Sequence, residues 1–195
     1  MDFEIKKLTP DLLDDWLYFF DHVGFADNGD WPGCYCMCYH WDSQLDEQFD
    51  WDTEVYQTKN PRNRNRAIHL IKTGVMQGYL AYHDGKAVGW CNANDKAVYR
   101  TVVFDFPWVP SEIGKKVKAI VCFCIAPKLR GYGIASQLLQ KICADAKADG
   151  YEYIEAYPFT LNEYNQYHGS LSLYKRQGFE AGGETCGCTI VRKYL

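Results

Sequence analysis

Residues 118–150 read KAIVCFCIAPKLRGYGIASQLLQKICADAKADG, and this stretch decides the fold. Its apolar run Ala119–Ala126 is rich in Ile, Val, Phe and Cys, which is typical of a strand buried on both faces. Pro127 ends the run. After a glycine-rich turn, apolar residues recur at helical spacing over Ile134–Ala146, and Gly150 stands where a helix is expected to end. The stretch therefore predicts a strand, a turn and an amphipathic helix in succession.

The turn between strand and helix has a chemical use. The first amides of a helix have no intrahelical partner and lie at the positive end of the helix dipole. Gly131 and Gly133 let a ligand approach the backbone closely, so a phosphate or pyrophosphate fits there. A plain connection between strand and helix would show the same pattern. Two common nucleotide loops do not match, because Ile134-Ala135 replaces the Lys-Ser/Thr pair of the P-loop and Ser136 replaces the third glycine of the dinucleotide fingerprint.

The residues Lys128-Leu129-Arg130-Gly131-Tyr132-Gly133 resemble the signature of the GNAT superfamily of acyl-CoA N-acyltransferases, Q/R-x-x-G-x-G/A between a strand and a helix. The first position is Lys, which keeps a positive charge. A second stretch, residues 170–179 (SLSLYKRQGF), resembles the late helix of that family, with its Leu-Tyr and Gly-Phe pairs at this spacing. The resemblance covers residues 76–195 well and residues 1–75 only loosely.

The resemblance implies the GNAT-like α/β (α+β) fold, in which helices flank a mixed, mostly antiparallel central sheet. It also implies a single acetyltransferase domain over residues 1–195. That length suits one domain, and no repeat or linker is visible. Two further strands, residues 77–83 and 87–92, are predicted to form a hairpin through Asp84-Gly85. A polar break is predicted at residues 93–96.

The same resemblance implies where an acyl-CoA would bind. The pantetheine arm would pair with the backbone of the cofactor strand, and an amide of that strand would steady the oxyanion. The pyrophosphate would lie on the amides of residues 130–136. The implied cofactor-binding residues are Phe123, Cys124, Ile125, Arg130, Gly131, Tyr132, Gly133, Ile134, Ala135 and Ser136.

Two residues are expected to carry the chemistry. The late-helix tyrosine of the family corresponds to Tyr174, which would hydrogen-bond the sulfur and protonate the leaving thiolate. The alternative for Tyr174 is a core aromatic. Glu155, on an expected strand beside the cofactor strand, is the candidate base that deprotonates the amine, with His168 second and a water chain third. An outward Glu155 could also be simply solvated.

Residues 33–41, GCYCMCYHW, place Cys34, Cys36 and Cys38 at alternate positions and add His40. Thiolates and imidazole are zinc or copper ligands, but structural zinc sites usually space their cysteines C-x₂₋₄-C. We therefore expect a strand with small buried cysteines, and we assign no metal ligand.

Composition narrows the function classes. A net charge of −4 predicts no bulk attraction to nucleic acid. No run of 18 apolar residues or signal peptide occurs, so no membrane partner is expected. Nine cysteines without an export signal favour free thiols in a reducing cytoplasm. The acidic run over residues 42–54 fits a solvated loop or a surface that attracts a cationic amine.

These inferences predict an N-acetyltransferase that moves an acetyl group from its cosubstrate acetyl-CoA to a primary amine by direct attack. The acceptor is a small molecule or a peptide, and the protein is a monomer or homodimer. Two-step transfer would need a nucleophile beside the thioester, and Cys124 is more simply a strand residue. The alternative function is a non-catalytic CoA-fold module that binds a metal or ligand through Cys34–His40. The aromatic connection Arg100–Lys116 is expected to fold over the site.

Overall fold

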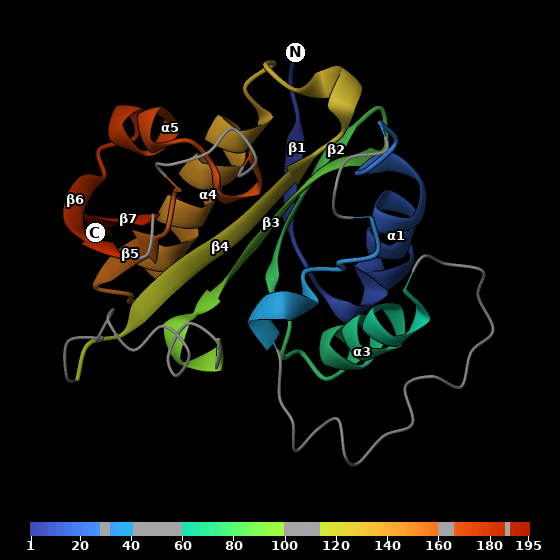
Figure 1. Cartoon of the computed structure of the whole chain (residues 1–195), viewed down its shortest axis with the longest axis horizontal. Coiled ribbons are helices and arrows are strands. Elements are labelled where there is room, and N and C mark those ends of the chain that lie inside the picture. The colour runs from blue at the N-terminus through green and yellow to red at the C-terminus, as the bar shows by residue number, and fades with distance from the viewer. Residues whose placement is uncertain (28–31, 41–59, 100–113, 160–165, 186–187) are drawn as a thin grey trace.

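The computed structural model of the chain describes residues 1–27, 32–40, 60–99, 114–159, 166–185 and 188–195. These residues form a seven-stranded sheet in the order β1-β2-β3-β4-β5-β7-β6, with helices on both faces (Figure 1). Among the strand pairs of this sheet, β4 and β5 are parallel and the others are antiparallel. The predicted mixed, mostly antiparallel sheet is confirmed.

The strands are β1 (Glu4–Lys7), β2 (Gly78–His83), β3 (Lys86–Asp95), β4 (Val117–Ile125), β5 (Tyr153–Ala156), β6 (Glu180–Thr185) and β7 (Cys188–Tyr194). The predicted strands over 77–83, 87–92 and 119–126 correspond to β2, β3 and β4. Asp84 and Gly85 both have positive φ, as a tight hairpin turn requires. The polar break predicted at residues 93–96 is wrong, because β3 continues to Asp95 and stays paired with β4. Asn94 is tolerated in the strand because its side-chain amide donates to the Val75 carbonyl at 2.8 Å.

The α-helices of the described residues are α1 (Leu13–Tyr18), α3 (Pro61–Lys72), α4 (Ile134–Ala148) and α5 (Leu171–Arg176). Polar side chains cap the start of two of them. The side chain of Asn60 accepts from an amide in the first turn of α3, and Ser170 does the same for α5. Within the described ranges, no helix combines the length and apolar character that crossing a bilayer requires.

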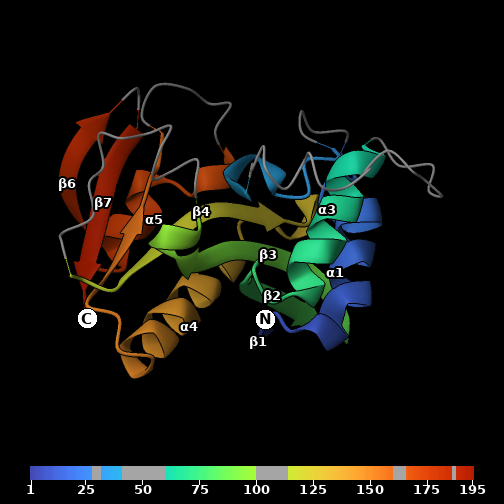
Figure 2. The ribbon, with the colours of Figure 1, turned by 90° about the horizontal axis from the view of Figure 1, so that it is seen from below.

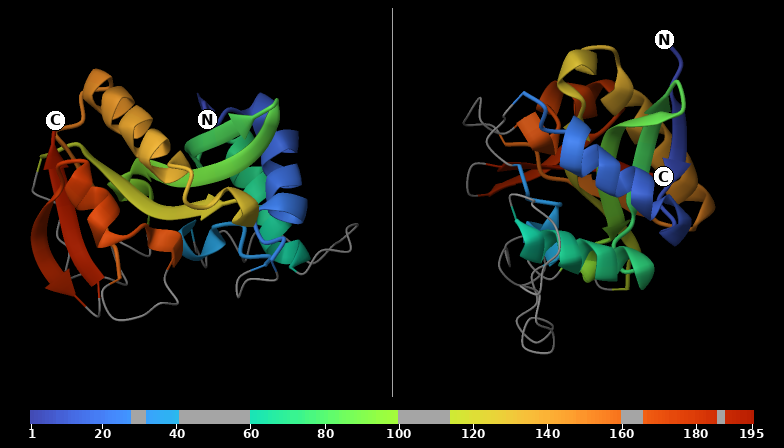
Figure 3. Two further views of the ribbon diagram at one scale, coloured as in Figure 1. Left: turned by 90° about the horizontal axis from the view of Figure 1, so that it is seen from above. Right: turned by 90° about the vertical axis from the view of Figure 1, so that its right-hand side faces the viewer.

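The sheet separates two cores. Figure 2 shows α4 on one side of the sheet and α1 and α3 on the other, and Figure 3 shows α1 and α3 side by side. Alternate residues of β4 face the two sides, so Cys122 and Cys124 join the core under α1 and α3, while Phe123 joins the core under α4 and α5. The prediction that this strand is buried on both faces is confirmed.

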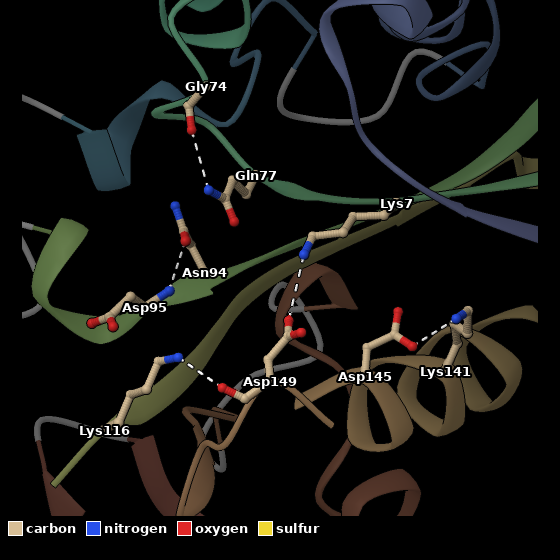
Figure 4. A network of polar contacts seen from close by, with 9 residues as sticks. All are labelled: Lys7, Gly74, Gln77, Asn94, Asp95, Lys116, Lys141, Asp145 and Asp149. Atoms are coloured by element: carbon tan, nitrogen blue, oxygen red, sulfur yellow. Dashed lines mark hydrogen bonds and ion pairs between the residues drawn. The ribbon is translucent and has the colours of Figure 1, made fainter. Parts of the chain in front are cut away.

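Two lysines, Lys7 and Lys116, contact the C-terminal end of α4. Lys7 of β1 pairs with the Asp149 carboxylate at 3.5 Å, and Lys116 donates to the Asp149 carbonyl at 2.8 Å (Figure 4). Cations at a helix C-terminus also interact favourably with its dipole. The axis of α4 is set by its buried apolar face, and these exposed contacts add little to it.

The cysteine segment is not a strand, so that prediction is wrong. Residues 32–36 form turns, and a 3₁₀ helix, η3, follows over Met37–His40. Tyr35 and Cys36 have φ of 44° and 54°, a region that non-glycine residues seldom adopt. Side-chain contacts hold this backbone in place: the Tyr35 hydroxyl donates to Asp21 at 2.6 Å, and the Trp90 indole donates to the Cys36 sulfur at 3.2 Å.

Two predicted features lie outside the described residues. The first is the acidic run over residues 42–54. The second is the aromatic connection over residues 100–116, of which the structure describes only residues 114–116, so its place over the site stays a prediction.

Candidate active site

The pairing between β4 and β5 ends before β4 does. Their parallel register runs from Val117 opposite Tyr153 to Ile120 opposite Ala156, where β5 ends. β4 continues to Ile125, still paired with β3 on its other side. A short 3₁₀ helix, η7 (Gln166–His168), contacts this part of β4. The end of β4 therefore lies beside an irregular segment where a strand partner would otherwise be.

A cavity of about 720 Å³ lies at this end of β4. Its walls come from the end of β4, from the glycine-rich turn with the first turn of α4, and from η7 with α5. It is lined by Phe123, Ile125, Leu129, Arg130, Gly131, Gly133, Ile134, Ala135, Ser136, Phe159, Tyr167, Gly169, Ser170, Leu173 and Arg176. A volume of this order suits a cofactor-sized ligand.

The floor of this cavity can bind an anion. Gly133 caps α4 in the left-handed conformation, with φ of 85°, and Gly131 has φ of 86°. The amide of Gln137 is the donor that bonds to the carbonyl of Gly133, so the amides before it have no partner within the helix. Arg176, in the last turn of α5, adds positive charge to the wall. Arg130 is also on the wall, but its guanidinium pairs with Asp27 at 2.7 Å.

Tyr174 is fully buried behind this wall. Its hydroxyl donates to the carbonyl of His168 at 2.9 Å, and its ring packs against Phe123 and Phe179. Burial raises the pKa of the Tyr174 hydroxyl well above its usual range, so the phenol stays protonated. Tyr174 is not among the lining residues, although its neighbour Leu173 is. Its role as the proton donor stays a prediction.

Glu155 is buried, not solvated. Its carboxylate accepts from the Tyr157 hydroxyl at 2.6 Å and pairs with Lys96 and Arg192, each at 2.7 Å. The reason is that β5 is an inner strand, flanked by β4 and β7. Glu155 does not line the cavity, and the contacts just given occupy both carboxylate oxygens. Its predicted role as base therefore gains no support from the geometry.

A second, smaller cavity of about 100 Å³ lies on the other face of β4. It is lined by Phe20, Phe25, Cys34, Cys36, Cys38, Tyr39, Cys122, Cys124, Tyr167 and His168. Tyr167 is also on the wall of the large cavity, so the two cavities are neighbours.

His168 lines the small cavity and packs against Phe159 of the large one. Its Nε2 is 3.0 Å from the hydroxyl oxygen of Tyr39, and its ring packs edge-on against Phe159, which lines the large cavity. Burial lowers the pKa of His168 to about 4, so the imidazole is neutral at pH 7. A neutral imidazole can accept a proton, and the same burial that keeps it neutral opposes the charge that it would then carry, so His168 is a weak base in this state.

The cysteines of the small cavity are neutral thiols. Burial raises the pKa of Cys36 and of Cys124 well above the usual range of a thiol. Within the described residues, no three His, Cys, Asp or Glu side chains are arranged to hold a metal ion. Protonated thiols are also poor nucleophiles, so the geometry favours neither a metal-binding role nor a cysteine acyl carrier.

The acetyltransferase (GNAT) family model matches residues 37–179, more than half of the chain. The chain belongs to the GNAT acetyltransferase family. Solved GNAT structures share its fold over almost their whole length. Among curated protein sequences, no significant match was found.

An N-acetyltransferase from Staphylococcus aureus Mu50 is 15% identical, with 100% of this chain and 99% of that chain covered and a TM-score of 0.57. The PaiA N-acetyltransferase from Thermoplasma acidophilum, solved with coenzyme A, is 14% identical with both chains fully covered (100% and 100%) and a TM-score of 0.55. A polyamine N-acetyltransferase from Drosophila melanogaster is 10% identical with the same coverage (100% and 100%) and a TM-score of 0.56. At these identities the likeness establishes the fold.

The large cavity gathers most of the cofactor-binding residues that the GNAT resemblance implied. Cys124 and Tyr132 are absent from its wall: the Cys124 side chain faces the small cavity, and Tyr132 is exposed. Strand alternation could have placed Cys124 on the far face. Arg176 was missed, although its position inside the recognised late-helix motif was a usable signal.

Proposed function

We propose that this GNAT acetyltransferase transfers the acetyl group of acetyl-CoA directly to a primary amine. One observation carries the proposal: a single cavity joins the anion-binding start of α4 to the end of β4 beyond its register with β5. A pyrophosphate suits the first place, and an extended pantetheine chain suits the second, since an extended ligand can add to a strand edge through backbone hydrogen bonds. When bound, acetyl-CoA supplies an activated acyl group.

The residues at the two ends of the cavity fit these parts of the cosubstrate. The amides of Ile134, Ala135 and Ser136 would face the pyrophosphate, and the exposed Arg176 would reach a phosphate oxygen. At the other end, a backbone amide of β4 near Cys124 would stabilise the negative charge that develops on the carbonyl oxygen. Tyr174 would donate its proton to the leaving thiolate once its hydroxyl turns from the His168 carbonyl.

For the base, the geometry favours His168 over Glu155. His168 is neutral, lines the small cavity, packs against Phe159 of the large cavity and has Tyr39 to orient its ring. Glu155 is held by two cations and lines neither cavity. We therefore assign to His168 the acceptance of the proton that the amine loses. A reducing compartment such as the cytoplasm would keep the neighbouring thiols reduced.

Calorimetric titration with acetyl-CoA and a thiol-release assay with primary amines test this function together. We expect saturable binding of acetyl-CoA and release of coenzyme A only when an amine is present. A His168→Gln variant should keep its affinity for acetyl-CoA and lose about 100-fold or more in turnover. Failure of the parent protein to bind acetyl-CoA would contradict the proposal, and acetylation at the parent rate by His168→Gln would remove His168 from it.

A further inference from the structure

We propose that the small cavity on the far face of β4 binds the apolar part of the acceptor, and that the acceptor is a primary amine with one compact alkyl group and no second charge. This inference rests on the proposed function, because it names the acceptor class of the same site. It assigns a purpose to the cysteine-rich segment, which the cofactor site does not use.

The first argument is position. Phe123 and Ile125 face the large cavity, and Cys122 and Cys124, which alternate with them along β4, face the small one. These residues follow Ile120, the last residue of β4 in register with β5. An amine in the small cavity and a thioester in the large one would therefore meet across the end of β4, beside the shared residue Tyr167.

The second argument is the chemistry of the wall. The lining residues within the described part of the chain are aromatic side chains, thiols and one imidazole, and none is a carboxylate, lysine or arginine. Buried thiols here stay neutral, as Cys36 and Cys124 do, and sulfur contacts apolar and aromatic groups favourably. A second ammonium group in this cavity would lose its hydration without a counter-ion, which is costly. Diamines and polyamines are therefore disfavoured.

The third argument is size. A dry apolar cavity of about 150 Å³ can hold a benzene molecule. The small cavity, at about 100 Å³, is smaller. It suits an alkyl group of roughly three or four carbons, with one aromatic ring as the upper limit.

The fourth argument is the polar end of the cavity. His168 and Tyr39 line this cavity, and the Tyr39 hydroxyl oxygen is 3.0 Å from Nε2 of His168. If the alkyl group lies among the thiols and Phe20 and Phe25, the amino nitrogen would face this pair. That orientation places the nitrogen beside the proposed proton acceptor and beside the opening to the large cavity.

The test compares butylamine with 1,4-diaminobutane, which differ in the second ammonium group and match in chain length. With the unmodified protein and acetyl-CoA, we expect kcat/KM for butylamine to exceed that for the diamine by at least about tenfold. Similar values for the two amines, with acetyl-CoA binding intact, would overturn this inference and leave the proposed function standing. Absence of acetyl-CoA binding would instead overturn the proposed function.

A pair of variants locates the acceptor. Cys122→Leu should fill the small cavity and lower kcat/KM for butylamine about tenfold or more, with calorimetric affinity for acetyl-CoA unchanged. The matched control is Cys143→Leu, on α4 and outside both cavities, which should act like the parent. Equal butylamine kinetics in folded Cys122→Leu and in the control would show that the acceptor binds elsewhere. If Cys122→Leu does not fold, the comparison of the two amines still decides the acceptor class.

A third variant should weaken the preference for the monoamine. Cys38 is the exposed cysteine of the cavity wall. Cys38→Asp would offer a carboxylate to a second ammonium group at the outer end of the cavity. We expect it to lower the ratio of kcat/KM for butylamine to kcat/KM for 1,4-diaminobutane by about tenfold. An unchanged ratio would contradict a binding mode in which the alkyl chain points toward Cys38.

Discussion

The hydroxyl of Tyr174 donates a hydrogen bond to the backbone carbonyl of His168 at 2.9 Å. The proposed proton donor therefore fixes the backbone that carries the proposed proton acceptor. Gly169, which separates η7 from the cap of α5, has φ of 74° and lies against the Tyr174 ring, so the turn between them is tightly packed. A change at either residue is expected to affect the other, and the two must be tested with separate readouts.

Tyr174→Phe should lower turnover and leave acetyl-CoA affinity nearly unchanged, because the ring still packs and only the proton donor is lost. General acids typically raise the reaction rate about 100- to 10,000-fold. Because the thiol of coenzyme A, with a pKa of about 8 to 9, is a fair leaving group, we expect a rate loss at the low end of that range. The lost bond to His168 should also cost about 1 kcal/mol of stability. Steady-state kinetics with calorimetry checks this, and a rate within about twofold of the parent would make Tyr174 a packing residue.

Gly133→Val should weaken acetyl-CoA binding at least tenfold, because the side chain would stand between the ligand and the helix amides. Gly150→Val is a matched control, since the two glycines have positive φ, of 85° and 74°, and open space where a side chain would begin. Gly150 ends α4 away from the cavity. Both variants should lose similar stability from backbone strain, and only Gly133→Val should change the calorimetric dissociation constant. Equal affinities would contradict the assignment of the pyrophosphate to this turn.

Glu155→Gln should destabilise the fold and spare the chemistry. The change removes the Glu155 carboxylate from the buried ammonium of Lys96, which is 2% exposed. Breaking a buried ion pair in this way costs roughly 3–5 kcal/mol. The surface pair Lys141–Asp145 offers a control, and Asp145→Asn should cost less than about 1 kcal/mol. Urea unfolding measures both. A stable Glu155→Gln protein with turnover reduced 100-fold would instead identify Glu155 as the base.

His40 should make the fold sensitive to acid. Burial lowers the pKa of His40 to about 4, with the Asn92 amide opposing and Arg66 adding to the effect. The unfolded chain takes up a proton near pH 6.5 and the folded chain does not, so stability is complete above pH 6.5 and is lost as the pH falls toward 4. The loss should reach about 3 kcal/mol at pH 4. The pKa of His168 is also lowered to about 4, so His168 adds a loss of its own over the same pH range. His40→Gln should therefore remove about half of this pH dependence, and the exposed His22→Gln is the matched control.

The sequence was informative where local signals agree with the fold. The strand, glycine turn and helix of residues 118–150 appear as β4, the turn and α4. The cysteine segment could not be predicted in this way. Its left-handed residues are held by contacts distant in sequence, such as the Trp90 indole on Cys36 across 54 positions.

The candidate site shows the same difference between local features, which the sequence predicts, and contacts between distant segments, which it does not. The turn proposed to bind the pyrophosphate is local in sequence, and its residues were identified from the motif. The burial of Glu155 depends on Arg192, 37 positions later on a strand that pairs with β5, and no local pattern announces that pairing. The small cavity is lined by Cys34, Cys122 and His168, which come from three distant segments of the chain. No local sequence pattern predicts that these segments lie together.

The strand order has a consequence for folding during synthesis. β7 follows β6 in the chain but lies between β5 and β6. A nascent chain made only as far as β6 has no strand to fill that gap, and its β5 edge stays open to other chains. Until Arg192 is added, the carboxylate of Glu155 also lacks one of its cations. The C-terminal half of the sheet is therefore expected to close only after translation has passed β7, which makes this half the one that a chaperone would have to shield.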